Sequence, residues 1–150
     1  MKRLAPYALM LLTICYSTGV FSQNPGTSKP KQFNNYPAVI SCTEAELIKA
    51  FGTTAGQSIN FSFSDNFNFS GNVISNVVKY SNLQTALIKS PNFNNSIFSI
   101  SKRVNANNSI TYTGRIINMD YFDGYELKQD ANANYKLLKI ETDKVIPVCK

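Results

Sequence analysis

The chain has 150 residues, 43% of them hydrophobic, and a formal net charge of +6. This length suits a single domain with a substantial core, and the basic residues are scattered, which is typical of a solvated surface rather than of a nucleic-acid-binding patch. The chain contains neither histidine nor tryptophan. Because histidine is the commonest general base and zinc ligand, its absence excludes hydrolases with a Ser-His-Asp triad and zinc sites that use histidine.

Residues 1–22 have the organisation of a signal peptide. Lys2 and Arg3 are basic, residues 4–15 are apolar, and Val20-Phe21-Ser22 provides a cleavage site. The apolar run is shorter than the ~20 residues that a membrane-spanning helix needs, and no later stretch is apolar enough to span. We therefore expect cleavage after Ser22, no membrane span, and a secreted or periplasmic protein.

Cys15 offers an alternative start for the exported chain. Leu12-Thr13-Ile14-Cys15 has the outline of a bacterial lipobox, with Cys15 as the lipidated residue. Ile14 stands where such boxes normally carry Gly, Ala or Ser, so the sequence favours signal cleavage over a lipid anchor. The intact mass of the mature protein would distinguish a chain that begins at Gln23 from a lipidated one.

Two cysteines, Cys42 and Cys149, remain after cleavage, one near the start of the mature chain and one at its end. An even pair of cysteines in an oxidising compartment predicts a disulfide. In the loop-entropy model, closing a loop of about 108 residues stabilises a domain by roughly 4 to 5 kcal/mol. The chain has no CxxC pair, so a redox or metal role for these cysteines is disfavoured.

The mature chain divides into a leader and a domain. Residues 23–37 are rich in Pro, Gly, Ser, Asn and Lys, which predicts a flexible leader, and residues 38–150 form the single domain. A short helix is predicted after Thr43, which can cap its first turn, and Gly52 can end it in the left-handed conformation. The apolar stripe of this helix consists of Leu47, Ile48 and Phe51.

Strands are predicted next. Residues 58–64 alternate strictly between apolar and polar, Asp65-Asn66 is a turn candidate, and residues 73–80 form another strand. Ser81 is expected to cap a brief helical turn that ends before Pro91, because the residue before a proline is disfavoured in a helix.

The segment from residue 96 to residue 140 reads as a meander of antiparallel strands. Pairing Val104 with Ile110 aligns the apolar faces of the first hairpin, with a three-residue connection in which Asn108 is left-handed.

In the second hairpin, pairing Leu127 with Leu138 keeps the apolar face continuous and leaves residues 131–134 as the loop. A shift of one residue would place Lys128 opposite Lys136, so the unshifted register is preferred.

These elements predict an α+β, mostly antiparallel β fold, in which a short N-terminal helix packs on a meander of about six strands closed by one disulfide. Residues 82–127 include Phe98-Ser99-Ile100-Ser101, Tyr112-Thr113-Gly114-Arg115-Ile116 and Tyr125-Glu126-Leu127. With these residues, and with a signal peptide ending in Phe21-Ser22-Gln23, the chain resembles small uncharacterised secreted proteins of Bacteroidota. The resemblance implies a bacterial exported protein and brings no activity with it.

One group of acids could carry chemistry. Asp120, Asp123 and Glu126 cluster around Gly124, and the simplest interpretation is a turn at Asp123-Gly124. Two alternatives are a calcium site made of these three acids and a carboxylate-dependent glycan hydrolase that uses them.

Aromatic and basic side chains suggest a binding surface instead. Tyr112, Arg115, Tyr121 and Tyr125 could stack on sugars or anchor a protein interface, with core packing as the competing interpretation. We therefore expect an exported, non-catalytic binding or accessory module of the bacterial envelope or secretome, for example a partner or inhibitor of a secreted enzyme. Its expected partner is a protein or glycan, and we expect no cofactor and no nucleic acid. A self-associating surface protein is a further alternative.

Overall fold

The computed structural model describes residues 29–145, and the structural statements below concern that part of the chain. Its strands are β1 (Val39–Cys42), β2 (Ser58–Ser64), β3 (Phe67–Tyr80), β4 (Leu83–Ser90), β5 (Ser96–Val104), β6 (Ile110–Ile117), β7 (Asp123–Gln129) and β8 (Tyr135–Glu141). Its helical segments are α2 (Glu44–Gly52), η2 (Pro91–Phe93) and α3 (Thr142–Val145).

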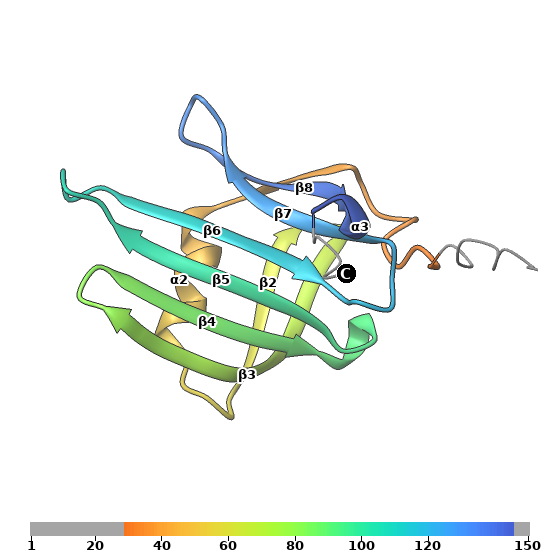
Figure 1. Ribbon diagram of the computed structural model, residues 1–150, viewed down its shortest axis with the longest axis horizontal. Helices are drawn as coiled ribbons and strands as arrows, with labels where there is room; N and C mark the ends of the chain where they lie inside the picture. The colour runs from red at the N-terminus through yellow and green to blue at the C-terminus, as the bar shows by residue number, and fades with distance from the viewer. Residues whose placement is uncertain (1–28, 146–150) are drawn as a thin grey trace, which may run out of the picture.

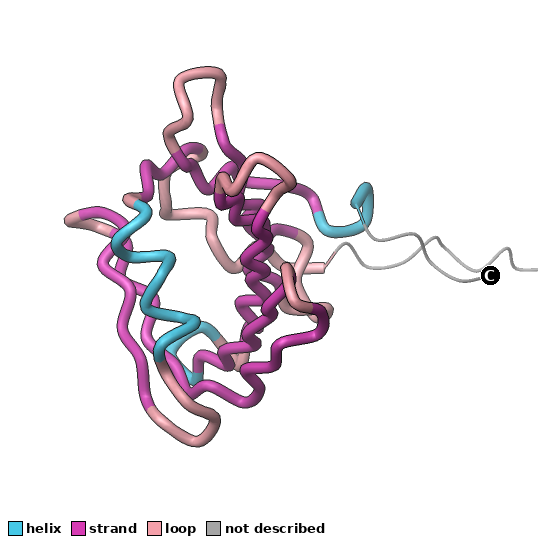
Figure 2. Tube along the Cα trace, turned by 90° about the vertical axis from the view of Figure 1, so that its left-hand side faces the viewer, coloured by secondary structure: helices cyan, strands magenta, loops and turns pink. Residues whose placement is uncertain are grey.

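The eight strands form one antiparallel sheet in the order β1-β8-β7-β6-β5-β4-β3-β2 (Figure 1). From β2 to β8, each strand pairs with the next strand along the chain, and the last strand, β8, also pairs with the first strand, β1. The sheet curls into a nearly closed barrel, because β1 and β2 approach each other, although the described residues form no ladder between them. Figure 2 shows the resulting ring of strands, with α2 along one side.

Aromatic rings fill the interior of the barrel. Alternation along each strand directs one row of apolar side chains inward. The ring centroid of Phe61 lies 5.3 Å from that of Phe63 and 5.4 Å from that of Phe98, the latter in an edge-to-face arrangement that aromatic pairs favour. The interior is therefore occupied by the protein's own side chains.

Helix α2 lies on the concave side of the sheet and begins as predicted. The Thr43 hydroxyl accepts a hydrogen bond from a backbone amide of the first turn at 3.3 Å. Leu47 and Ala50 are buried, whereas Ile48, predicted on the apolar stripe, is 48% exposed. Gly52 does not take the predicted left-handed conformation, because the helix continues through it to an extended residue. None of the helices in residues 29–145 is long and apolar enough to cross a membrane.

The predicted fold class is wrong apart from its mostly antiparallel β character. The structure has eight strands in a nearly closed barrel instead of a helix on about six strands. Residues expected to form a helical turn after Ser81 are strand β4, because β3 and β5 pair along both of its sides and this tertiary pairing outweighs local propensity.

The predicted disulfide is also corrected. In the described part of the chain Cys42 is a buried free cysteine, and Cys149 lies outside the described residues. Burial raises the pKa of the Cys42 thiol to about 12, as is typical of a cysteine that packs in a hydrophobic core.

The two hairpins of the meander differ in outcome. The register predicted for β5 and β6 is confirmed, since Val104 pairs with Ile110 and Asn108 is left-handed with φ 63°. The register predicted for β7 and β8 is wrong by one residue, since Leu127 pairs with Leu137.

Residues 29–37, part of the predicted leader, pack against the barrel. Phe33 is fully buried, and its ring centroid lies 5.1 Å from that of Tyr125. The Lys139 amine donates hydrogen bonds to the carbonyls of Phe33 and Tyr36, each at 2.7 Å. We call residues 29–37 the N-terminal strap, and Phe33 is its anchor in the core.

Candidate functional site

The four residues of the predicted binding surface do not form one surface. Tyr112 and Tyr125 are buried in the core, with 1% and 0% exposure. Burial, followed by the nearby Glu44 carboxylate, raises the pKa of Tyr112 to about 12, and burial also raises the pKa of Tyr125. The Tyr125 hydroxyl donates to the Pro37 carbonyl at 2.6 Å, so it fastens the N-terminal strap.

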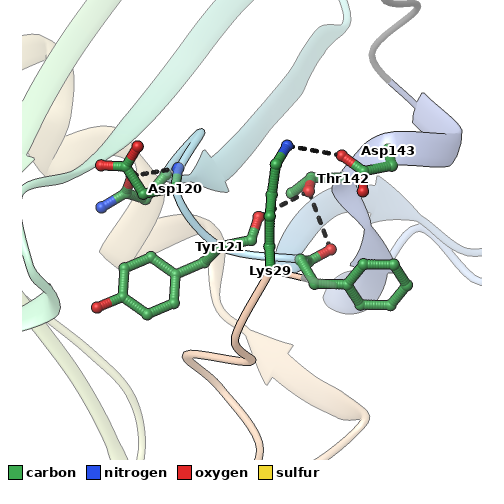
Figure 3. A network of polar contacts seen from close by, with 7 residues as sticks. Lys29, Asp120, Tyr121, Thr142 and Asp143 are labelled. Carbon is green, nitrogen blue, oxygen red and sulfur yellow. Dashed lines mark hydrogen bonds and ion pairs between the residues drawn. The ribbon is translucent and has the colours of Figure 1, made fainter. Parts of the chain in front are cut away.

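Arg115 and Tyr121 lie apart from these tyrosines. The Arg115 guanidinium, on the outer face of β6, pairs with the Glu126 carboxylate at 2.9 Å. Tyr121 lies in the loop between β6 and β7, where its carbonyl accepts a hydrogen bond from the Thr142 hydroxyl at 2.8 Å (Figure 3). This loop is therefore tied to α3 through main-chain contacts.

The three clustered acids do not converge either. Asp123 is buried, and its two carboxylate oxygens accept the N–H groups of Gln32 and Phe33 at 2.6 and 3.0 Å. Asp120 is exposed in the loop (Figure 3), and Glu126 lies on the opposite face of β7 from Asp123. Residues 29–145 contain no group of three or more potential metal ligands, so these acids do not form the predicted calcium site.

Glu126 is instead held as a carboxylate. A hydrogen bond from Lys128, and then one from Arg115, lower its pKa below the usual range. A general acid of a glycan hydrolase needs a raised pKa, so the surroundings of Glu126 oppose that role.

A groove lies where β6 and β7 separate. The ladder between these strands has only three residue pairs, from Gly114 with Leu127 to Ile116 with Tyr125. The groove has a volume of about 630 Å³, and its lining combines four Ser and Thr residues with apolar side chains such as Ile117 and Leu127 and with the charged residues Arg115, Glu126 and Lys128. Glu126 is the only acid of the lining and pairs with both Arg115 and Lys128, so the groove carries one more cation than anion.

A free strand edge is the second surface feature. Strand β2 pairs with β3 only from Phe67 to Asn72. At Val73, the N–H donates to the Gln57 carbonyl at 2.9 Å and the carbonyl accepts from Gly56 at 2.8 Å. Beyond Val73 no strand of residues 29–145 pairs with this side of β3. We call residues 74–80 of β3 the free edge.

The hydrogen-bonding direction of the free edge follows from the neighbouring ladders. In an antiparallel sheet, successive residues direct their N–H and C=O groups to alternate sides. The Val104 N–H donates to the Asn82 carbonyl at 2.9 Å, so the backbone groups of Asn82 point toward β5. The backbone N–H and C=O groups of Gln84, two residues further along, point the same way, toward Lys102 of β5. Val78 lies opposite Gln84, and its N–H and C=O groups therefore point away from β4, toward the free side.

Apolar side chains accompany these backbone groups. Of the eight large hydrophobic residues that are exposed in the described chain, half lie on the free edge. They are Ile74 (50% exposed), Val77 (50%), Val78 (64%) and Tyr80 (68%). Such a concentration of exposed apolar side chains is typical of an interaction site.

The free edge is held in place from the concave side. The Asn76 side-chain amide donates to the carbonyls of Ala50, Phe51 and Thr53 at the end of α2, at 3.2, 3.2 and 2.8 Å. The Gln84 side-chain amide donates to the side-chain oxygen Oδ1 of Asn76 at 2.8 Å. These bonds satisfy the last turn of the helix and fix the strand in an extended shape before any partner binds.

The surroundings of the free edge are basic. The chain contains no Asp or Glu between Asp65 and Asp120, a stretch that forms β3, β4, β5 and β6. Its cations are Lys79, Lys89, Lys102, Arg103 and Arg115. Among them, only Arg115 forms an ion pair within residues 29–145.

Sequence reasoning predicted a strand at residues 73–80 but not its edge position. The signal that could have indicated it is the loss of alternation at Val77-Val78-Lys79, since neither face of this segment can be fully buried.

Comparison with known proteins adds no functional assignment. No protein-family model matches the chain, and no curated protein or solved structure is significantly similar to it.

Proposed function

We propose that the protein is an exported, non-catalytic binding module that pairs an extended segment of a partner protein with the free edge of β3. The observation that supports this function is the coincidence of outward-pointing backbone groups at Val78 with four exposed apolar side chains. In strand addition, main-chain hydrogen bonds supply affinity and alternate side chains supply specificity.

The same edge is poorly suited to a second copy of this chain. Two copies paired through β3 would bring two acid-free halves of the sheet together, with Lys79 and its neighbours on both sides. Like charges facing each other across an interface are unfavourable, so charge favours a different protein as the partner.

Irregularities at both ends limit the length of the partner segment. The β3–β4 register shifts between Val73 and Ser75 and again between Val78 and Tyr80. Bulges of this kind protect strand edges from indiscriminate pairing. The regular part of the edge is therefore Ser75 to Val78, which suits a short recognition segment rather than a long strand.

The alternative of a carboxylate-dependent glycan hydrolase gains no comparable support. Asp123 and Glu126 occupy opposite faces of β7, and each is engaged by other groups of the protein. The groove between β6 and β7 has Glu126 as its only acid, so it does not present the pair of carboxyl groups that glycan hydrolysis needs.

The test uses two variants of one residue. Val78→Pro removes the outward N–H without removing a ladder bond to β4, and proline is tolerated at strand edges. Val78→Thr is the matched control, because it keeps the N–H and the β-branched shape. Both variants and the wild type are screened against a displayed library of peptides of about nine residues, longer than a typical strand.

We expect the wild type to enrich peptides with alternating apolar residues, and we expect these peptides to bind Val78→Thr with similar affinity. Their affinity for Val78→Pro should be at least about tenfold lower, because one or two hydrogen bonds to the edge are lost. Thermal unfolding must show that both variants are folded. Equal binding by Val78→Pro, or no enriched peptide, contradicts the proposal. A concentration-dependent dimer that Val78→Pro abolishes would assign the edge to self-association instead.

A further inference from the structure

We infer that the segment bound at the free edge carries an acidic side chain, which enters a hollow beside the end of β3 and pairs with Lys102. This inference rests on the proposed function and specifies its partner. It follows from the shape of the hollow, the position of Lys102 and the charge of the surrounding sheet.

The hollow lies over the start of β4, between the end of β3 that carries Val78 and the end of β5. It is lined by Val78, Tyr80, Gln84, Lys102 and Val104, with the β3–β4 turn completing its wall. Its volume is about 110 Å³. Since a water molecule takes about 30 Å³ of liquid volume, the hollow has room for a single side chain rather than for a larger ligand.

Lys102 lies in the same cross-strand row as the edge. Val78 is opposite Gln84, and Gln84 is opposite Lys102, so these three side chains share the concave face of the sheet. The Lys102 amine stands 6.0 Å from the centre of the Phe51 ring, a cation–π contact at its outer limit. Lys102 forms no ion pair within residues 29–145, so its charge is available to a ligand.

The neighbouring charges reinforce this preference. Lys79 and Arg103 flank the same end of the sheet, and the strands around them contain no acid. Their summed field attracts an acidic segment and disfavours a basic one. The apolar walls of Val78, Tyr80 and Val104 suit the methylene groups of a side chain, whereas a nucleic acid or sulfated glycan needs a row of cations.

Geometry also favours glutamate over aspartate. An added strand lies about 4.8 Å beyond β3. Lys102 lies on β5, which is separated from β3 by β4. The carboxylate therefore has to extend along the row formed by Val78 and Gln84 to meet the Lys102 amine. The longer side chain of glutamate reaches further along this row.

The experiment uses peptides selected on the wild type, synthesised with blocked ends so that only side chains can supply a carboxylate. Lys102→Met removes the charge and keeps an apolar stem, and Lys89→Met removes another exposed, unpaired charge of the same sheet half as the matched control. We expect Lys102→Met to weaken binding about tenfold, as loss of one charged hydrogen bond implies. Lys89→Met should change affinity less than about twofold.

Substitutions in the peptide complete the test. Glutamate to glutamine in the peptide should cost as much as Lys102→Met, and the two losses should not add. A peptide with lysine at that position should bind Lys102→Glu better than it binds the wild type.

The two proposals fail in different ways. If Val78→Pro abolishes binding but Lys102→Met does not weaken it, strand addition stands and the carboxylate inference is overturned. If the selected peptides lack acids, or bind only with a free C-terminal carboxylate, the side-chain inference is likewise overturned. A third outcome is that a sulfated polysaccharide displaces every peptide and that Lys102→Met and Lys89→Met weaken peptide binding equally. These two results together would overturn the inference and indicate a general polyanion-binding surface instead.

Discussion

At the scale of single residues, Glu126 shows how one carboxylate can be fixed by its neighbours. Lys128 and Arg115 contact its two oxygens at 2.8 and 2.9 Å, and its side chain is only 18% exposed. The hydrogen bond from Lys128, then that from Arg115, lower its pKa below the usual value of 4.5. The residue predicted to bind calcium or act in catalysis is thereby committed to a surface ion-pair network.

This network predicts a pH-dependent contribution to stability. Because the folded-state pKa of Glu126 lies below the unfolded-state pKa, its stabilisation is complete above the unfolded value and is lost as the pH falls through the folded value. Glu126→Gln should lower the free energy of unfolding by about 1 kcal/mol or less at pH 7, since the side chains of both partner cations reach solvent, Arg115 with 41% and Lys128 with 59% exposure.

Urea denaturation at a series of pH values measures this contribution. The difference between Glu126→Gln and the wild type should shrink toward zero below the folded-state pKa. Asp120→Asn, which alters an exposed carboxylate with no ion pair in residues 29–145, is the control. A difference that stays constant across this range would show that Glu126 acts through packing.

At the scale of elements, turns account for the one-residue difference between the predicted and observed β7–β8 register. The Asp130 carboxylate accepts the N–H groups of Asn132 and Asn134 at 2.9 and 3.0 Å. The Asp130 N–H bonds to the Asn134 carbonyl at 2.8 Å, so the loop is residues 131–133. This loop shortens the connection by one residue and shifts the whole ladder.

The expected clash between lysines does not prevent this register. Lys128 faces Lys136, but Lys128 pairs with Glu126 at 2.8 Å and Lys136 pairs with Asp130 at 2.9 Å. Cross-strand repulsion assumed from sequence was therefore overestimated, because each lysine pairs with an acid: Lys128 with Glu126 of its own strand, and Lys136 with Asp130 at the end of the opposite strand.

Elements with strong local signals were predictable, and those determined by their neighbours were not. The β5–β6 register follows from alternation and from Asn108, whose residue type tolerates the left-handed conformation. By contrast, β4 reads locally as a helical turn, and its strand state depends on pairing with β3 and β5. The free edge was equally hidden, because it results from the unequal lengths of β2 and β3.

The β7–β8 loop gives a prediction at this scale. Ala133 has φ 64°, a left-handed conformation that costs an L-residue other than glycine roughly 1 kcal/mol or more. Ala133→Gly should therefore raise the free energy of unfolding by about 0.5 kcal/mol, after the added flexibility of the unfolded chain is subtracted.

Ala131→Gly provides the comparison for this loop, because Ala131 does not have a positive φ. That substitution should leave stability unchanged or lower it by up to about 1 kcal/mol. Chemical denaturation of both variants measures the two effects. Destabilisation by Ala133→Gly would show that the loop does not hold the left-handed conformation in solution.

At the scale of the whole molecule, two kinds of connection complete the barrel. Helix α2 joins β1 to β2, so these strands are not a hairpin and the sheet stays open between them. The N-terminal strap then packs against the barrel through Phe33, with its amides bound by Asp123 of β7 and its carbonyls by Lys139 of β8. Strap and barrel should unfold together.

Phe33 tests this cooperation, because it is fully buried and packs against aromatic rings from three separate parts of the chain. Its ring centroid lies 6.1 Å from that of Phe67 in β3, 5.5 Å from that of Phe93 in η2 and 5.1 Å from that of Tyr125 in β7. Phe33→Ala should lower the free energy of unfolding by about 3 to 5 kcal/mol, the usual cost of an aromatic cavity in a core.

Met119→Ala is the matched control, since Met119 is 56% exposed and its truncation should change stability by less than about 0.5 kcal/mol. Amide hydrogen exchange adds the decisive readout. If the strap belongs to the cooperative unit, the Gln32 and Phe33 amides, which are bound to Asp123, exchange only by global unfolding. A Phe33→Ala variant as stable as the wild type, with fast exchange at these amides, would place the domain boundary after the strap, where sequence composition alone puts it.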